Sequence, residues 1–379
     1  MNTRLRALQV YRTYFPDPPG GLQEAIRQIA IASSGFGIQN KIFTLSPNPL
    51  PQTIARQEGD VLRSRSWAAP ASCDLGGLAA FRKFSQACGE SNIVHYHFPW
   101  PFEDVLHAVI RPKIPAVMTY HSDVIRQKFL GAAYAPLMWR TLKAMQVIVA
   151  TSPAYVRTSP VLSHPSIRDK VRVIPLGIVE ESFSREEDNG VFKRLGIDRN
   201  EPYFLFIGVL RYYKGLHTLI QAARHVGVKI VIAGSGPEED KLKQLAEQEG
   251  AKNIIFAGQI TDSEKVALLQ SCLALVLPSH FRSEAFGMVL VEAAMFGKPQ
   301  ISCEIGTGTS FVNAHEETGI VLPPEAPDDM AQAMNQLLHE TSAAEAMGLA
   351  ARARYERLFS GDALGKAYAD LYREVVDGL

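Results

Sequence analysis

The segment SEAFGMVLVEAAMFGKP (283–299) carries two carboxylates, Glu284 and Glu292, at a Glu-x₇-Glu spacing within a largely apolar run. The run predicts a buried helix, and Gly287 permits the turn that opens it. Free N–H groups at a helix start bind phosphate, and carboxylates accept hydrogen bonds from vicinal sugar hydroxyls. The amides concerned are those of Phe286, Gly287, Met288 and Val289. The alternative is structural: Glu284 as a cap and Glu292 in a buried hydrogen bond.

A second segment, FIGVLRYYKGLHTLI (206–220), supplies the complementary charge. Arg211 and Lys214 follow a predicted strand, and Gly215 opens a helical pattern. Two cations at the carboxyl end of a strand can hold a diphosphate, because Arg offers a bidentate fork and Lys a point charge. Taken alone, the segment is equally consistent with a solvated loop carrying two ordinary surface charges.

Weaker candidates follow other predicted strands. His121, in VMTYHSD (117–123), could donate to a sugar hydroxyl or a phosphate, or act as an acid or base; a structural role is as frequent. Gly20 and Gly21 let the backbone approach a ligand or adopt a positive φ, although a tight loop also explains them.

Other patterns count against common cofactors. His95 and His97 share one side of a predicted strand, but no Cys or acidic spacing completes a metal site. AGSGP (233–237), which contains Gly236, lacks the third glycine of a dinucleotide-binding turn, and no Gly-x₄-Gly-Lys-Ser/Thr motif is present. We therefore expect neither a metal nor a resident cofactor.

Short apolar runs rich in β-branched residues alternate with helical stretches, which predicts buried parallel sheets in an α/β chain. Strands are expected at 5–11, 39–46, 92–98, 115–121, 145–152 and 171–177, and again at 202–210, 228–234, 253–258, 274–279, 298–303 and 319–323. The polar segment 180–190 predicts a linker, and 328–376 predicts three helices. We expect domains at 1–178 and 179–361, with a C-terminal helix at about 362–379 packing back on the first. Ligands bind at the carboxyl ends of such strands, so the site is expected in the cleft between two Rossmann-like domains.

Charge is unevenly distributed along the 379 residues. Residues 1–178 hold 20 Lys and Arg against 10 Asp and Glu, whereas residues 179–379 hold 19 against 29. The basic half could face phosphates or an anionic membrane surface; attraction between the domains, or chance, is the alternative. No apolar run approaches ~18 residues, and four scattered cysteines suit a reducing compartment. We expect a cytoplasmic protein, peripheral at the inner membrane face, with no nucleic-acid partner.

Taken in order, these motifs resemble the retaining glycosyltransferases of family GT4, which have the GT-B fold. The resemblance covers nearly the whole chain. It rests on Gly20–Gly21, His121, Arg211 with Lys214–Gly215, Gly234-Ser235-Gly236-Pro237 and Glu284-x₇-Glu292. Many members have Gly-Arg where this chain has Gly208–Val209, and we expect Arg211 to substitute for that arginine. The segments 206–216, 304–313 and 119–123 are similar to a bacterial subgroup that builds surface polysaccharides, several of them mannosyl- or rhamnosyltransferases using GDP-sugars.

The resemblance implies a role for each site residue. Arg211, Lys214 and the amides from Phe286 to Val289 would hold the diphosphate of a nucleotide sugar. Glu292 would take the ribose hydroxyls, and Glu284 the hydroxyls of the transferred sugar. His121 would reach that sugar from the other domain. The remaining donor-side positions are Gly20, Gly21, Gly236, Gln259 and Ile260, the last two beside the base.

The implied reaction moves a hexose to a glycan or lipid-diphosphate-linked acceptor with retained anomeric configuration. No second carboxylate is evident as a nucleophile, so same-face attack is favoured, with the departing phosphate taking the acceptor's proton; double displacement is the alternative. Fixed cations and helix amides would neutralise the leaving diphosphate without a metal. A sugar-nucleotide epimerase and a non-catalytic nucleotide-sugar-binding protein are the competing functions.

Overall fold

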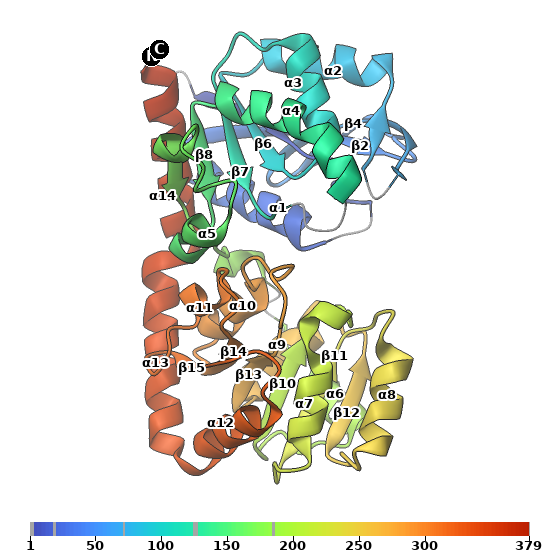
Figure 1. Cartoon of the computed structure of the whole chain (residues 1–379), viewed down its shortest axis with the longest axis vertical. Helices are drawn as coiled ribbons and strands as arrows, with labels where there is room; N and C mark the ends of the chain where they lie inside the picture. The colour runs from blue at the N-terminus through green and yellow to red at the C-terminus, as the bar shows by residue number, and fades with distance from the viewer. Residues whose placement is uncertain (1–3, 18–19, 71–72, 124–127, 184–185, 379) are drawn as a thin grey trace. The chain divides into compact units, whose positions relative to one another are not determined.

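The computed structural model describes residues 4–17, 20–70, 73–123, 128–183 and 186–378, so Pro18, Pro19 and residues 184–185 of the expected linker lie outside the described residues. The chain forms two compact units, Met1–Val179 with Gly361–Leu379, and Glu180–Ser360. Each unit is a sheet with helices packed on it (Figure 1). The two Rossmann-like sheets of the GT-B fold are thus confirmed.

The sheet of the first unit is mainly parallel. The described strands run in the order β3 (Thr53–Arg56), β4 (Gly59–Ala68), β2 (Ile38–Ser46), β1 (Leu5–Val10), β6 (Ile93–Phe98), β7 (Ala116–Tyr120), β8 (Val147–Ala150) and β9 (Val171–Val173). β3 and the short β5 (Leu75–Gly76) pair antiparallel with β4. The sequence analysis did not predict β3, β4 or β5, because polar and charged residues interrupt their apolar pattern.

Helices cover this sheet. They are α1 (Gly21–Ser34), α2 (Leu78–Gly89), α3 (Pro101–Ile110), α4 (Lys128–Ala144), α5 (Pro153–Thr158) and the C-terminal α14 (Gly361–Asp377). α14, red in Figure 1, packs closely on α1: a Cβ at Gly365 would lie 2.3 Å from the carbonyl oxygen of Ala32. The buried face of α14 includes Tyr368 and Tyr372, which reach polar side chains of the sheet.

The second sheet is wholly parallel among the described residues. Its order is β12 (Ile254–Gly258), β11 (Lys229–Ala233), β10 (Tyr203–Ile207), β13 (Ala274–Leu277), β14 (Gln300–Cys303) and β15 (Gly319–Leu322). From β10, successive strands are added on one side as far as β12 and then on the other side from β13 to β15, so the order of strand addition reverses between β10 and β13. Ligands bind at the carboxyl ends of strands at such a switch point. Arg211 and Lys214 lie in the loop after β10, and Glu284 lies in the loop after β13.

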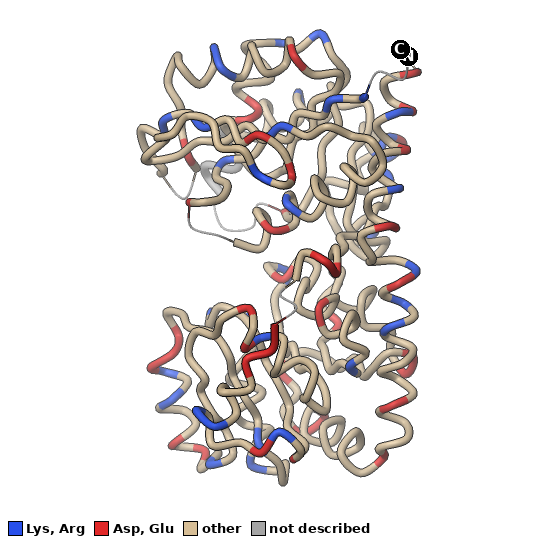
Figure 2. The backbone as a smooth tube through the Cα atoms, turned by 180° about the vertical axis from the view of Figure 1, so that it is seen from behind, with Lys and Arg blue, Asp and Glu red and all other residues tan. Residues whose placement is uncertain are grey.

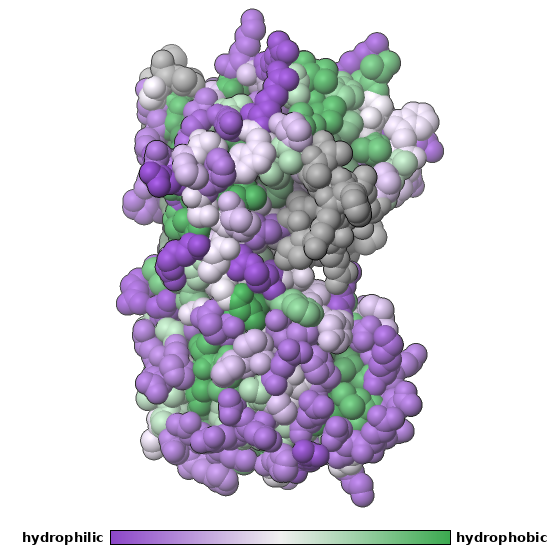
Figure 3. Space-filling view, in the orientation of Figure 1, coloured by the Kyte–Doolittle hydropathy of each residue, from purple (hydrophilic) through white to green (hydrophobic). Residues whose placement is uncertain are grey.

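The helices of the second unit are shorter. They are α6 (Gly190–Leu195), α7 (Leu216–Ala223), α8 (Glu239–Gln248), α9 (Asp262–Ser271), α10 (Met288–Met295), α11 (Thr309–Val312), α12 (Pro327–His339) and α13 (Thr341–Leu358). α10 is buried because its residues are apolar almost all round, as the sequence predicted. The face of this unit visible in Figure 3 is mostly hydrophilic, as expected where the apolar residues are used in the core.

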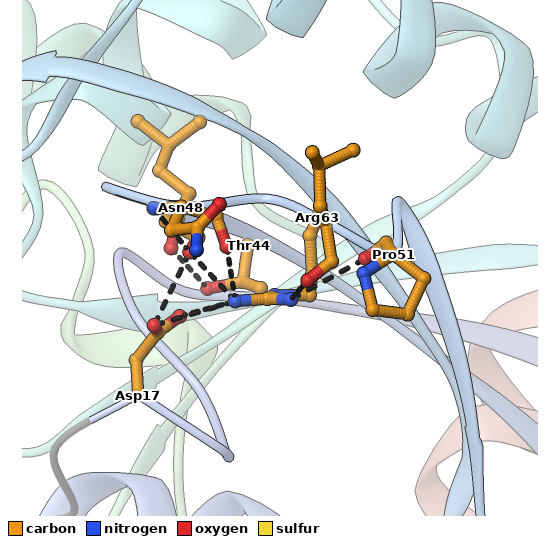
Figure 4. Close-up of polar contacts among 8 residues, drawn as sticks. Asp17, Thr44, Asn48, Pro51 and Arg63 are labelled. Atoms are coloured by element: carbon orange, nitrogen blue, oxygen red, sulfur yellow. Dashed lines mark hydrogen bonds and ion pairs between the residues drawn. The ribbon is translucent and has the colours of Figure 1, made fainter.

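A buried arginine anchors the loop between β1 and α1. Arg63, on β4, has a side chain only 4% exposed and forms an ion pair with Asp17 at 3.4 Å. The same guanidinium donates to Ser46 Oγ at 2.8 Å and to the carbonyl oxygen of Asn48 at 2.7 Å (Figure 4). Asp17 lies three residues before Gly20 in the sequence, and Arg63 holds the described part of this loop, up to Asp17.

We expect Arg63→Ala to lower the free energy of unfolding of the first unit by about 3–5 kcal/mol, because it leaves the largely buried Asp17 carboxylate without its cation. All three tryptophans, Trp67, Trp100 and Trp139, belong to this unit, so their fluorescence in a urea titration monitors it selectively. Arg172→Ala, which breaks an exposed pair with Glu374, is the control and should have a much smaller effect on the free energy of unfolding. Equal effects of the two changes would contradict the anchoring role.

Candidate functional site

The centre of the candidate site is an ion pair at the switch point of the second sheet. Lys214 lies in the 3₁₀ turn after β10, and Glu284 lies in the loop after β13. The Lys214 ammonium donates to the Glu284 carboxylate, which also accepts from Ser279 Oγ at 3.2 Å. Both side chains are nearly buried, at 12% and 11% exposure. The pair is therefore a fixed, largely desolvated feature of this edge of the sheet.

Gly215 makes this close approach possible. It has φ +67°, and a Cβ there would lie 2.0 Å from the carbonyl oxygen of Pro278. The loops after β10 and β13 can therefore touch only where residue 215 has no side chain. Gly215 also precedes the first residue of α7, as the sequence predicted.

Lys214 keeps its charge. Burial lowers the pKa of its ammonium group, but the charges of Glu284 and Tyr213 and the hydrogen bond to Glu284 together outweigh burial, so the pKa is raised. Lys has three donors, and Glu284 takes one of them. From the sequence, Lys214 was expected to hold the diphosphate and Glu284 the hydroxyls of the transferred sugar. The structure places the two side chains together, so the Glu284 carboxylate is also the counter-ion of Lys214.

Arg211 presents a second positive charge beside this pair. Its residue is exposed, and its charge lowers the pKa of Lys214, as expected for neighbouring cations. Among the described residues, no carboxylate lies within ion-pair distance of its guanidinium. The carboxyl edge of β10 thus offers an exposed arginine next to a partly engaged lysine, which is an arrangement suited to an anion of two or more charges.

The glycine-rich turn after β11 supports the loop that carries these cations. Leu210 donates its amide to the carbonyl oxygen of Ser235 at 3.0 Å, and a Cβ at Gly236 would lie 2.4 Å from the carbonyl oxygen of Leu210. Gly236 is therefore required by backbone packing. Its expected contact with a donor stays a prediction, as do those of the exposed Gln259 and the half-buried Ile260 after β12.

The start of α10 lies on the same edge. Gly287 has φ +82° and caps the helix, which begins at Met288. Phe286 is buried with its ring 6.2 Å from that of Phe359, so this turn is held by packing. The structure gives no hydrogen bond from the backbone amides of Phe286 to Val289 to another described residue, and their binding of a phosphate stays a prediction.

Glu292, in α10, has a partner that the sequence analysis missed. Lys265 Nζ of α9 lies 3.3 Å from Glu292 Oε1, and the same ammonium lies 4.4 Å from the ring centroid of Phe183. The Glu292 side chain is 16% exposed. Nothing in DSEKVALL distinguishes Lys265 from a surface lysine, so only the tertiary structure identifies it. The assignment of Glu292 to ribose hydroxyls stays a prediction.

In the first unit, Gly20 and Gly21 are exposed at the start of α1, where Gly20 is the N-cap. Neither has a positive φ, so the alternative of left-handed backbone is excluded for both. A Cβ at Gly21 would meet no atom within 4 Å, which leaves its backbone open to a ligand. Close approach to a donor or acceptor therefore stays the prediction for this pair.

His121 follows β7 and is 5% exposed. Its Nε2 lies 3.0 Å from His97 Nδ1, and His97 Nε2 lies 2.9 Å from Gln9 Oε1. The Gln9 amide nitrogen donates to Asn40 Oδ1 at 2.9 Å and to the Tyr372 hydroxyl. The sequence analysis weighed His97 as a metal ligand, whereas the structure makes it the middle of a hydrogen-bond chain.

These hydrogen bonds determine which ring nitrogen carries the proton in His97 and in His121. Because the Gln9 oxygen can only accept, His97 must carry its proton on Nε2, and its Nδ1 must accept. His121 therefore donates from Nε2, and its Nδ1 has no proton in the neutral ring. Burial lowers the pKa of His121 to about 3, and burial with the charges of His95 and His121 holds the pKa of His97 well below its usual range. His121 is therefore a neutral ring with an available lone pair on Nδ1.

The buried histidines predict acid sensitivity of the first unit. The pKa of His121 is about 3 in the folded chain and about 6.5 unfolded, so below pH 6.5 the unfolded chain binds a proton that the folded chain does not. The free energy of unfolding should be independent of His121 above this pH and should fall by up to about 1.4 kcal/mol per pH unit below it. Tryptophan fluorescence in urea at pH 7, 6 and 5 measures this. His121→Asn should make the dependence less steep, because it removes one of the buried histidines and leaves His97 in place, whereas His339→Asn, in the second unit, should leave it unchanged.

Basic residues of the first unit are spread over many elements in Figure 2, as are the acidic residues between them. No helix within the described ranges is long and apolar enough to cross a bilayer.

Two family models match the chain. Residues 19–182 match the model described as glycosyltransferase family 4, and residues 188–354 match the model described as glycosyl transferases group 1. The boundary between the two matches falls between the two sheets.

Close relatives cover almost the full length. The chain is 43% identical to the D-rhamnosyltransferase WbpZ of Pseudomonas aeruginosa over 94% of this chain and 92% of the relative. It is 39% identical to O-antigen chain mannosyltransferase C of Escherichia coli over 98% and 99%.

Solved structures share the fold at low identity. A sucrose-phosphate synthase from Thermosynechococcus elongatus superimposes with a TM-score of 0.80 at 22% identity, covering 99% of this chain and 100% of that one. Anabaena HepE, in complex with UDP, gives 0.79 at 18% identity with the same coverage. With the two family models and the two full-length relatives, these matches show that the chain belongs to glycosyltransferase family 4, a retaining family with the GT-B fold.

Proposed function

We propose that this glycosyltransferase moves a mannosyl or rhamnosyl unit from a GDP-sugar to a glycan or lipid-diphosphate-linked acceptor of a surface polysaccharide. The full-length relatives named for D-rhamnose and for O-antigen mannose support this choice of sugar. The observation that carries the donor assignment is the charge at the switch point of the second sheet: an exposed arginine beside a lysine that has donors to spare.

In this proposal, the second unit binds the donor and the first unit the acceptor. Arg211, Lys214 and the amides at the start of α10 neutralise the charge that develops on the leaving diphosphate. Glu284 orients Lys214 and accepts from a hydroxyl of the transferred sugar. The departing phosphate takes the proton of the acceptor hydroxyl, and the new bond forms on the face that the phosphate leaves.

His121 contributes as a neutral group. Its Nδ1 lone pair can accept a hydrogen bond from a sugar hydroxyl, but its lowered pKa excludes it from supplying positive charge at neutral pH. The excess of Lys and Arg in residues 1–178 supports peripheral attachment to an anionic membrane surface, where a lipid-linked acceptor is found.

The experiment that tests the proposal compares GDP-mannose, GDP-rhamnose, UDP-glucose and ADP-glucose in thermal-shift assays on the purified chain. A donor at 100 times its Kd stabilises the folded chain by about 2.7 kcal/mol. Stabilisation by a GDP-sugar, followed by transfer to a lipid-linked acceptor with an α-linked product seen by NMR, is the expected result. Stabilisation by UDP- or ADP-sugars alone would overturn the GDP assignment.

The sugar-nucleotide epimerase considered above requires no acceptor. Incubation with donor alone therefore separates the two functions: a new nucleotide sugar indicates the epimerase, whereas an unchanged donor that is consumed on adding acceptor indicates the transferase.

A further inference from the structure

We propose that the chain has a zinc site formed by His217, His280 and Glu325, beside the residues proposed to hold the donor. This goes beyond the transferase activity, for which no metal is invoked. One helix and two loops at the carboxyl edge of the second sheet bring these residues together: His217 lies in the first turn of α7, His280 follows β13, and Glu325 follows β15. One ligand atom of each lies within 4.8 Å of those of the other two.

His280 provides the main argument. It is 7% exposed, and both of its ring nitrogens are buried without a hydrogen-bond partner among the described residues. The buried rings of His95, His97 and His121, by contrast, each make hydrogen bonds. An imidazole has one donor and one acceptor, and leaving both unsatisfied in the interior is unfavourable. A metal ion at this position would bind the nitrogen lone pair that no protein group uses.

The surroundings hold His280 in place without satisfying it. Its backbone amide donates to the carbonyl oxygen of Tyr213 at 3.0 Å, and the rings of Tyr212 and Phe281 lie 5.0 Å and 4.2 Å from its own. The Tyr212 ring also stacks on His217, at 5.6 Å and 14°. Aromatic contacts fix both imidazoles but supply no lone pair or proton, so the rings are positioned and still free to bind a metal.

Glu325, between β15 and α12, completes the ligand set. Its Oε1 lies 3.9 Å from His217 Nε2, and its side chain is 61% exposed. Helix α12, which starts just after Glu325, packs on α7, and Asn335 of α12 donates to the carbonyl oxygen of His225 at 2.9 Å. The carboxylate is thus held near the two rings by the fold, while its exposure lets it move the remaining distance.

The chemistry of the three ligands selects the ion. Two neutral imidazoles and one carboxylate form a set that binds zinc, with a water in the fourth position. Zinc–ligand bonds of about 2.0–2.2 Å require the three ligand atoms to lie closer to one another than they do in this structure. The exposed side chain of Glu325 can move to shorten these distances. The bound ion would tie the loop carrying Arg211 and Lys214 to the loop carrying Glu284. Its expected role is to stabilise that edge of the sheet.

The test uses the full chain without an affinity tag, after dialysis against a chelator. Zinc binding is measured by competition with a chromophoric chelator, and cobalt substitution is followed by visible absorption. We expect one ion per chain and a tetrahedral cobalt spectrum. His280→Gln and Glu325→Gln should each weaken binding by at least about tenfold.

His315→Gln is the matched control, because His315 also lies beside a carboxylate, with its Nε2 3.8 Å from Glu316 Oε1, but lacks a second histidine. It should leave zinc affinity unchanged. Calorimetry should show that zinc raises the unfolding temperature of the unchanged chain and not that of the Glu325 variant, which alters an exposed side chain and should fold. Less than one ion per chain, or an affinity that none of the ligand changes reduces, would overturn the site. Neither readout depends on transferase activity, so the site can fail while the proposed function stands.

Discussion

Replacing Lys214 with alanine should lower kcat/KM for the nucleotide sugar by about 10²–10³-fold, the usual effect of removing one group that stabilises charge developing in a transition state. Lys214 stays protonated because Glu284 raises its pKa against the effect of burial, so it is a permanent cation. Its neighbour Arg211 is exposed and more adaptable, and Arg211→Ala should cost at least about tenfold. Initial rates over a range of donor concentrations measure both effects.

The ion pair introduces an ambiguity that a double variant resolves. Lys214→Ala also leaves the Glu284 carboxylate, which is 11% exposed, without its counter-ion. In Lys214→Ala with Glu284→Gln, that uncompensated charge is absent. If Lys214 contacts the donor, the double variant stays as slow as the slower single variant. Recovery of activity in the double variant would mean that Lys214 serves only to neutralise Glu284. Lys241→Ala, which alters an exposed pair with Glu238, is the control.

The parts of the fold that follow from local pattern could be predicted from the sequence. Continuous apolar strands such as 203–207 and 274–277 indicate a buried parallel sheet, and the order of the motifs identifies the family. The hairpin β3–β4 could not be predicted, because β3 is largely exposed and the buried part of β4 depends on pairing with β2 and on the interactions of a buried arginine, Arg63.

The candidate site residues could be named from the sequence, but their pairings could not. Glu284 and Lys214 both follow strands and carry charge, yet they are 70 residues apart, and only the parallel order β10–β13 makes them neighbours. The same is true of Glu292 with Lys265. The role of Gly236 also changes, because the carbonyl of Leu210 occupies the space where a side chain would lie. The sequence identifies the charged groups, whereas tertiary contacts decide which of them form ion pairs with one another.

The second large effect is expected at the histidine chain of the first unit. If the proposed function is right, His121→Ala should lower kcat by about 10²-fold, because it removes the acceptor proposed for a hydroxyl of the transferred sugar. The hydrogen bonds from Gln9 through His97 dictate that this acceptor is Nδ1. In ¹⁵N-histidine NMR spectra of the free chain, His121 should therefore show the tautomer protonated on Nε2, assigned by its loss in the variant.

His97→Leu distinguishes positioning from packing. It removes the acceptor that holds the His121 proton, so the His121 signal should become a mixture of tautomers and kcat should fall, with KM for the donor nearly unchanged. Tyr96→Phe, on the same strand, removes a hydrogen bond to His107. It is the control for the loss of a buried polar group. Because the pKa of His121 is about 3, its ring should also stay neutral through the pH range of assay, and activity should show no ionisation of this group between pH 5 and 8. Two results would show that the hydrogen bonds from Gln9 through His97 do not determine the protonation of His121. One is a His121 ring that titrates near pH 6.5, and the other is a His121 tautomer that is unaffected by loss of His97.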